Sequence, residues 1–262
     1  MKKVQTKTSG NKFNRSISLL KLSLVLLFMW SLLGCESQQE PSQPKQHATQ
    51  QATQQDYEVQ AAENQTFTIL ALGDSLTEGL GVKQDGNYPA LLQQTLHQQG
   101  YSQIKVINSG LSGETSSGLK SRVDWVLQLK PDLTILNIGA NDAMRGLPLS
   151  LTTGNINDII VRIQASGSEV VLAGMQIYDN LGQEYVAGFK DMYPKLAEQH
   201  ELVMIPFFLE HVGGDPKLNQ ADMIHPTSEG YEIIVQRNVL PTVLPLIKQL
   251  IQQKNNATHN QE

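Results

Sequence analysis

The sequence contains a single cysteine, Cys35, among 262 residues. An intrachain disulfide is therefore excluded. Long hydrophobic runs are also missing: the almost wholly apolar stretch Leu22–Leu33 has twelve residues, whereas a transmembrane helix needs about 20. Acidic residues are absent from residues 1–34, which hold six of the 20 Lys and Arg. The first 34 residues thus differ in character from the rest of the chain.

Residues 1–34 are typical of an export signal, because basic residues precede a short apolar run. The stretch Leu32–Cys35 (Leu-Leu-Gly-Cys) resembles the lipobox of bacterial lipoproteins, although Leu33 stands where a small residue is more usual. The resemblance implies that Cys35 is lipidated and holds an exported protein on a membrane of the bacterial cell envelope, facing the periplasm or the exterior. An uncleaved transmembrane helix is the alternative, which the shortness of the run disfavours.

Two polar segments flank the expected domain. Residues 35–65 are dominated by Gln, Ala, Ser, Thr and Pro, and residues 255–262 are polar throughout. Neither segment can bury enough apolar area to offset the entropy of ordering. We therefore predict a flexible tether at 35–65, a folded domain at 66–254 and a disordered tail at 255–262.

The charge of the exported part excludes one class of partner. Without residues 1–34, 14 of the 20 Lys and Arg remain against all 25 Asp and Glu, a net charge of −11. A chain this acidic lacks the basic surface that nucleic-acid binding requires. We expect no nucleic-acid partner, and we expect a monomer.

Short apolar segments alternate with longer amphipathic ones from residue 67 onward. The apolar segments lack in-out alternation, which is typical of parallel strands covered on both faces. The sequence predicts an α/β three-layer sandwich with a mainly parallel five-stranded sheet. The last helical region, 228–251, contains Pro241 and Pro245 and is expected to break there. The expected strands are 67–72, 104–108, 133–138, 169–174 and 202–206, and the other expected helices are 89–99, 115–129, 151–165 and 184–200.

A serine follows the first expected strand directly. The tetrapeptide Gly73–Leu76 (Gly-Asp-Ser-Leu) places Ser75 at the carboxyl edge of the sheet, where ligands bind in such folds. Read alone, Gly-Asp-Ser is also common in simple turns. A nucleophilic serine would need a base, and six histidines are available.

His225 is the strongest candidate base. Asp222 lies three residues before it, and Pro226 directly after it biases it away from helix. A carboxylate beside the imidazole would fix its tautomer. The same residues could instead form a capped helix start, and His211, which follows the last expected strand, remains open by position.

Two further elements follow strand ends. In the stretch 108–115 the glycines could bring a backbone N–H to a developing oxyanion, and after the third strand Asn141 could donate its side-chain amide to the same oxygen. Each could also be a turn that caps a helix. All four elements, however, fall at strand ends of one sheet.

In this order the motifs resemble the SGNH or GDSL hydrolase superfamily over about residues 67–252. The motifs are Gly73–Leu76, Gly113, Gly139–Asp142 and Asp222–Pro226. The likeness is greatest to the branch of periplasmic arylesterases, thioesterases and lysophospholipases. It implies a flavodoxin-like sheet, Ser75 as nucleophile, His225 as base and Asp222 as its orienter. It further implies an oxyanion hole of the Ser75 N–H, the Gly113 N–H and the Asn141 side chain, with no cofactor.

The substrate is indicated only weakly by the sequence. Apolar residues after strand ends could line an acyl pocket and would favour short to medium acyl esters, thioesters or lysophospholipids. The polar stretch Ser109–Gly118 leaves a carbohydrate or cell-envelope O-acyl esterase open. The pocket candidates are Met144, Leu147, Pro148, Ile177 and Tyr178.

Two alternatives come from other classes of protein. A metallophosphoesterase also uses Gly-Asp and Asn-Asp motifs, but it needs several His and Asp ligands, and here only Asp222 and His225 are suitably close in sequence. We therefore expect no metal. The second alternative is a non-catalytic lipoprotein that binds an envelope partner.

Overall fold

The computed structural model describes residues 66–178 and 181–259. The signal sequence, Cys35 and the tether predicted at 35–65 lie outside these residues. Five parallel strands form one sheet in the order β2-β1-β3-β4-β5. This confirms the predicted α/β class and five-stranded parallel sheet. The strands are β1 (Phe67–Gly73), β2 (Ile104–Gly110), β3 (Leu133–Asn137), β4 (Glu169–Ala173) and β5 (Val203–Ile205).

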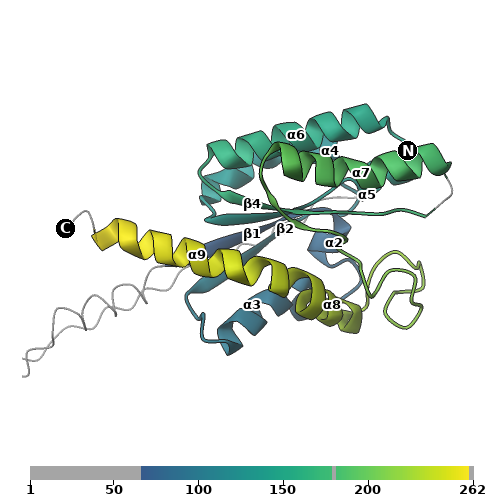
Figure 1. Cartoon of the computed structure of the whole chain (residues 1–262). Coiled ribbons are helices and arrows are strands. Elements are labelled where there is room, and N and C mark those ends of the chain that lie inside the picture. Colours follow the sequence, from purple (N-terminus) through teal and green to yellow (C-terminus); the bar gives the residue numbers. More distant parts are fainter. Residues whose placement is uncertain (1–65, 179–180, 260–262) are drawn as a thin grey trace, which may run out of the picture. The chain divides into compact units, whose positions relative to one another are not determined.

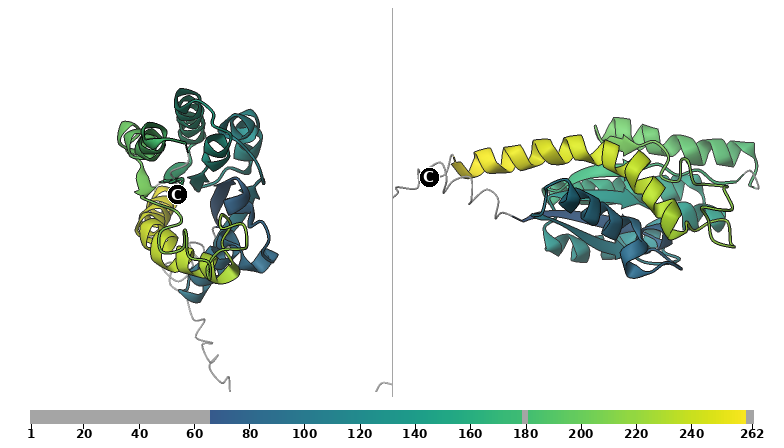
Figure 2. Two further views of the ribbon diagram at one scale, coloured as in Figure 1. Left: turned by 90° about the vertical axis from the view of Figure 1, so that its right-hand side faces the viewer. Right: turned by 90° about the horizontal axis from the view of Figure 1, so that it is seen from below.

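Helices cover both faces of the sheet and make the predicted three layers (Figure 1). One layer contains α4, α6 and α7, and the other contains α3, α8 and α9, as the end-on view in Figure 2 also shows. The helices are α2 (Ser75–Glu78), α3 (Tyr88–Gln98), α4 (Ser116–Val126), α5 (Ala140–Met144), α6 (Leu149–Ala165), α7 (Gln183–Gln199), α8 (Ser228–Ile234) and α9 (Leu240–His259), with 3₁₀ turns at Gln84–Gly86 and Leu127–Leu129.

The core explains why the strands were visible in the sequence. All five residues of β3 and six of the seven in β1 are buried, because helices pack on both faces of these central strands. Within residues 66–178 and 181–259, none of the helices combines the length and apolar character that a bilayer crossing needs.

The strand register brings three loops together at one edge. Gly73 at the end of β1 pairs with Gly110 of β2 on one side and with Asn137 of β3 on the other. The carboxyl ends of these three strands are therefore level. The segments that follow them, which begin at Asp74, Leu111 and Ile138, leave the sheet side by side.

The predicted break near Pro241 is a wider helical turn instead. Residues Val235–Val239 form a π-helix between α8 and α9, in which the Leu240 N–H donates to the carbonyl of Val235. The shift in hydrogen bonding lies directly before the proline, which has no N–H to donate. The chain thus accommodates Pro241 without leaving the helix, and α9 also continues past Pro245.

The C-terminal residues differ from the expected tail. Helix α9 runs to His259, so residues 255–259 are helical where the sequence predicted disorder from 255. Extending an existing helix costs far less than starting one. Lys254 also fixes this end, because its ammonium contacts Asp132 Oδ1 at 2.8 Å and the Thr66 carbonyl at 3.1 Å. Residues 260–262 lie outside the described part.

Candidate active site

Ser75 stands at a tight turn between β1 and α2. A side chain at Gly73 would place its Cβ 2.1 Å from the carbonyl oxygen of Asn137, so only glycine fits where the chain leaves the sheet. Asp74 then caps α2 by accepting the Leu76 N–H at 3.1 Å. The cap makes Ser75 the first residue of the helix and sets its hydroxyl at the carboxyl edge of the sheet.

The predicted base lies beside this serine. His225 Nε2 is 2.8 Å from Ser75 Oγ, and His225 Nδ1 is 2.6 Å from Asp222 Oδ2. The other carboxylate oxygen of Asp222 accepts the backbone N–H groups of Ile224 and His225 at 2.9 and 3.0 Å. The structure thus brings Ser75 together with His225, which lies 150 positions further along the chain, and with the neighbouring Asp222. With Nδ1 protonated toward Asp222, Nε2 is free to accept the serine proton.

The other described histidines do not contact Ser75. His97 bonds the Ile104 carbonyl at 2.7 Å, and His200 bonds Asn157 Oδ1 at 2.8 Å. His211 is exposed in the segment after β5, in the left-handed backbone region with φ 67°. The sequence left His211 open, and among the described histidines His225 is the one in hydrogen-bond contact with Ser75.

The two predicted oxyanion donors sit on neighbouring segments. Asn141 lies in the first turn of α5, is 7% exposed, and its amide reaches Asp74 Oδ2 at 3.4 Å. Gly113 adopts φ 75° in the loop between β2 and α4. Its carbonyl accepts a hydrogen bond from Arg145 at 2.7 Å. The carbonyl of Gly113 is thus occupied by Arg145, while its N–H donates to no backbone carbonyl of the described residues.

Comparisons with known proteins identify the family of the chain. Residues 71–233 match the GDSL-like Lipase/Acylhydrolase family. The chain belongs to this family. It is therefore a GDSL serine hydrolase that acts on ester bonds.

Two relatives and one solved structure indicate how close the likeness is. Esterase TesA of Pseudomonas aeruginosa is 36% identical over 181 residues, which cover 69% of this chain and 89% of that protein. An arylesterase of Vibrio mimicus is 37% identical, over 67% of this chain and 88% of that one. The crystal structure of esterase EstA from Pseudoalteromonas sp., inhibited by monoethylphosphonate, has a TM-score of 0.66 at 28% identity, covering 69% and 98%.

In this GDSL hydrolase the loop between β2 and α4, which carries Gly113, is held by a nearly buried ion pair. Arg122 of α4 makes two bonds to the carboxylate of Glu114, at 2.7 and 2.6 Å, and Glu114 is 7% exposed. The same guanidinium donates to the carbonyl of Ser109 at 2.9 Å and to that of Gly73 at 3.4 Å. One arginine thus joins the ends of β1 and β2 to the residue that follows Gly113.

Further hydrogen bonds, buried at one end and exposed at the other, fix both ends of the loop. Asp142 accepts the backbone N–H and the hydroxyl of Ser116, at 2.7 and 2.5 Å. The carboxylate of Glu78 accepts the N–H of Ser112 at 2.8 Å and also its hydroxyl. Asp142 and Ser112 thus connect the loop to α5 and α2.

The pKa values of two carboxyl groups near Ser75, those of Asp74 and Asp222, are changed in opposite directions. Burial raises the pKa of Asp74 to about 7, against the hydrogen bond from Leu76, which lowers it. Partial burial also raises the pKa of Asp222, but the hydrogen bonds from the His225 side chain and from two backbone N–H groups outweigh it and bring it to about 2. Asp222 therefore stays ionised next to the imidazole of His225.

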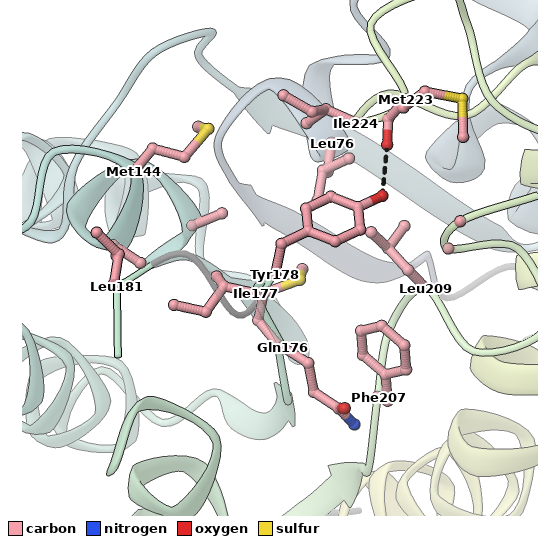
Figure 3. Close-up of a pocket in the computed structure, with 15 residues that line it drawn as sticks. Leu76, Met144, Gln176, Ile177, Tyr178, Leu181, Phe207, Leu209, Met223 and Ile224 are labelled. Atoms are coloured by element: carbon pink, nitrogen blue, oxygen red, sulfur yellow. Dashed lines mark hydrogen bonds between the residues drawn. The ribbon is translucent and has the colours of Figure 1, made fainter. Parts of the chain in front are cut away.

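An apolar cavity of about 570 Å³ opens beside these residues (Figure 3). It begins at Leu76, next to Ser75, and extends between α5, the segment after β4 and the segment after β5. Three of the five predicted pocket residues line it, namely Met144, Ile177 and Tyr178. Its other lining residues are Leu76, Ala140, Ala143, Met175, Gln176, Leu181, Phe207, Leu209, Gly213, Gly214, Met223 and Ile224.

Leu147 and Pro148 do not line the cavity, which corrects the expectation for these two residues. They lie in the connection to α6, where Pro148 immediately precedes the helix and the Leu147 carbonyl accepts the hydroxyl of Tyr185 at 2.7 Å. The chain turns away after Met144 through Arg145 and Gly146, so only the beginning of this apolar segment faces the cavity. The sequence analysis also did not predict the cavity wall that Phe207 and Leu209 form after β5, a strand of only three residues.

In the part of the chain that the structure describes, no three His, Cys, Asp or Glu side chains gather in the way that a metal site needs. The ionisable groups next to Ser75 are arranged as a hydrogen-bonded relay instead.

Proposed function

We propose that Ser75 is the nucleophile, His225 the general base and Asp222 the group that orients it. The observation that carries this proposal is the continuous relay from Ser75 Oγ through the imidazole to Asp222, with distances of 2.8 and 2.6 Å. Both distances are within the range for strong hydrogen bonds. The ionised Asp222 would stabilise the imidazolium that forms when the serine gives up its proton.

The proposed reaction has two acyl-transfer steps. Ser75 Oγ attacks the ester carbonyl carbon while His225 Nε2 takes the serine proton. The carbon–oxygen bond to the alcohol then breaks, and His225 returns the proton to the leaving oxygen, which leaves an acyl group on Ser75. Water repeats the sequence and releases the acid.

The oxyanion of each tetrahedral state would be bound by the N–H groups of Ser75 and Gly113 and by the Asn141 amide. Supporting this role, the buried network of Arg122, Glu114 and Asp142 fixes the positions of these donors before substrate binds. Donors that need no reorganisation contribute most to the rate.

For the substrate we propose an ester with a short to medium acyl chain. The cavity beside Ser75 has apolar walls, which suit a hydrocarbon chain. A sugar acetate is less suited, because the polar side chains of the Ser109–Gly118 loop are used inside the protein: Ser109 bonds Arg122 and Ser117 bonds Asn155, both at 2.8 Å. Activity on aryl esters, thioesters and lysophospholipids of matched chain length would rank these head groups.

We further propose that the enzyme is an exported, monomeric lipoprotein tethered through Cys35. This rests on the basic and apolar segments and the Leu-Leu-Gly-Cys stretch of the sequence. Replacing Cys35 by Ser should move the protein from the membrane to the soluble fraction or stall its processing. Unchanged fractionation would contradict the tether without affecting the catalytic proposal.

Labelling by a fluorescent organophosphonate tests the nucleophile. Wild type should be labelled and should hydrolyse p-nitrophenyl butyrate in the presence of a chelator, whereas Ser75→Ala should do neither. Asn141→Ala should keep its label and lose about 100-fold or more in kcat, as expected for one oxyanion donor. Ser121→Ala, on the exposed face of α4, is the matched control with unchanged activity. Wild-type activity in Ser75→Ala would overturn the assignment, and absence of labelling in wild type would favour a non-catalytic lipoprotein.

A further inference from the structure

The side chain of Tyr178 crosses the apolar cavity. Its hydroxyl donates to the carbonyl of Met223 at 3.0 Å, so the segment after β4 is joined to the loop that carries Asp222 and His225. The two residues are 45 positions apart in the sequence. In Figure 3 the ring lies at the centre of the cavity, with the dashed bond running to Met223.

The ring separates two groups of cavity-lining side chains. In the view of Figure 3, Met144 and Leu181 lie on one side of it, and Leu209 lies on the other. The first group comes from α5 and the segment before α7, and the second from the segment after β5. In this view the ring therefore stands between cavity-lining side chains that come from different segments of the chain.

The ring is held there by little except its hydroxyl. Tyr178 is 59% exposed, so packing fixes it far less than it fixes the fully buried tyrosines of the core. An exposed aromatic side chain without a partner would sample several rotamers. The bond to Met223 selects the one in which the ring spans the cavity.

The acceptor is itself in an unusual conformation. Met223 has φ 58°, in the left-handed region that few non-glycine residues adopt. In the sequence it lies between Asp222 and His225 of the proposed relay. Such a conformation persists only where its surroundings hold it. The Tyr178 bond is one such restraint, and the Met223 N–H, which donates to the Gln220 carbonyl at 2.9 Å, is another.

From these contacts we infer that Tyr178 is a specificity-determining residue that sets the length of acyl chain the cavity accepts. This inference rests on the proposed function. A short chain fits in the part of the cavity nearest Ser75 with the ring in place. A longer chain must displace the ring and break its bond to Met223 before it reaches the lining side chains on the far side of the ring.

The test is the acyl-length profile of Tyr178 variants. The values of kcat/KM would be measured for p-nitrophenyl acetate, butyrate, octanoate and laurate. Tyr178→Ala removes the ring from the cavity and should raise the laurate-to-butyrate ratio of kcat/KM at least about tenfold, the order of discrimination that a change in fit gives in a hydrophobic pocket. Tyr178→Phe keeps the ring but loses the bond, so it should raise the ratio about threefold, as expected for one neutral hydrogen bond.

Tyr185→Phe is the matched control. Its hydroxyl also donates to a backbone carbonyl, that of Leu147 at 2.7 Å, but Tyr185 does not line the cavity. This variant should keep the wild-type profile. If Tyr178→Ala does not fold, Tyr178→Phe decides the question alone.

The result that overturns the inference is an unchanged profile in folded Tyr178 variants that are still labelled by the organophosphonate. Such a result leaves the proposed nucleophile intact. Failure of the proposed function would instead appear as wild-type protein that is neither labelled nor active, so the two failures are distinguishable.

Discussion

The two sides of the active site are built differently. On the side of Ser75, Asn141 and Gly113, three of the supporting carboxyl groups are buried: Asp142 is 0% exposed, Asp74 is 1% exposed and Glu114 is 7% exposed. On the other side, the side chain of Asp222 is 44% exposed and belongs to a loop. The donors proposed to bind the transition state are thus fixed by the core, whereas the base is carried by a surface loop.

This difference has a physical reason. Oxyanion donors stabilise charge only if they are already in place, so they gain from a rigid, desolvated support. The base must accept and return a proton, and for this an ionised carboxylate in contact with water is sufficient. The loop side also carries Tyr178 and Met223, where movement would let the cavity adjust to its substrate.

The largest effect on the rigid side is expected from Arg122→Met. The substitution leaves Glu114 buried without its cation and should lower the free energy of unfolding by about 3–5 kcal/mol, as when one partner of a buried ion pair is removed. The control is Lys120→Met, which breaks a more exposed pair with Asp158 and should cost far less, because solvent screens an exposed ion pair. Urea unfolding measures both. Equal losses in the two variants would mean that the ion pair of Arg122 does not support the loop.

The pH dependence of stability should separate the two carboxyl groups. The pKa of Asp74 is about 7 in the folded protein against 3.8 as its ordinary value. As pH rises from 3.8 to about 7, the unfolded chain loses this proton first, so the group progressively destabilises the fold, by up to about 4 kcal/mol. Asp74→Asn should remove this decline, which urea unfolding at several pH values would measure.

Asp222→Asn is the control for that experiment, because its pKa change has the opposite sign. The pKa of Asp222 is lowered to about 2, so its contribution to stability is present above 3.8 and is lost as pH falls through about 2. The substitution should therefore leave the slope between pH 4 and pH 8 unchanged while it lowers activity. A slope that changes in Asp222→Asn but not in Asp74→Asn would reverse our assignment of the buried and exposed carboxyl groups.

The sequence predicted the parts of the molecule that depend on local pattern. Buried strands such as β1 are visible as apolar runs, and Asp222 and His225 are three residues apart, so their pairing needs only a loop. The partners of Arg122 were not predictable in this way. Its contact with Gly73 depends on the register between β1 and β2, which no local pattern encodes.

The same limit applies to the cavity and to the last helices. Tyr178 meets Met223 only because the segments after β4 and after β5 lie at one edge of the sheet. The helical path through Pro241 depends on a π turn that widens the helix before it. In both cases the deciding hydrogen bond involves a backbone group. Every residue type carries the backbone carbonyl, so the sequence does not indicate which one is bonded.

The smallest effect is expected on the loop side, from Gln220→Ala. The Gln220 amide donates to the carbonyls of Leu80 and Pro226 at 2.7 and 2.9 Å, which ties the catalytic loop to the segment after α2. Its removal should lower the free energy of unfolding by only about 1–2 kcal/mol, because net hydrogen-bond contributions are modest. Since His225 directly precedes Pro226, kcat should fall several-fold while KM changes little.

Gln199→Ala is the matched control, since its amide makes one exposed bond, to Asn157 Oδ1 at 3.0 Å, on α7 away from the cavity. It should leave kcat unchanged. A loss of stability in Gln220→Ala as large as in Arg122→Met would show that the loop is as firmly held as the oxyanion side. In that case a rigid support would position the proposed base as well. The two sides of the active site would then differ only in how far their carboxyl groups are exposed to solvent.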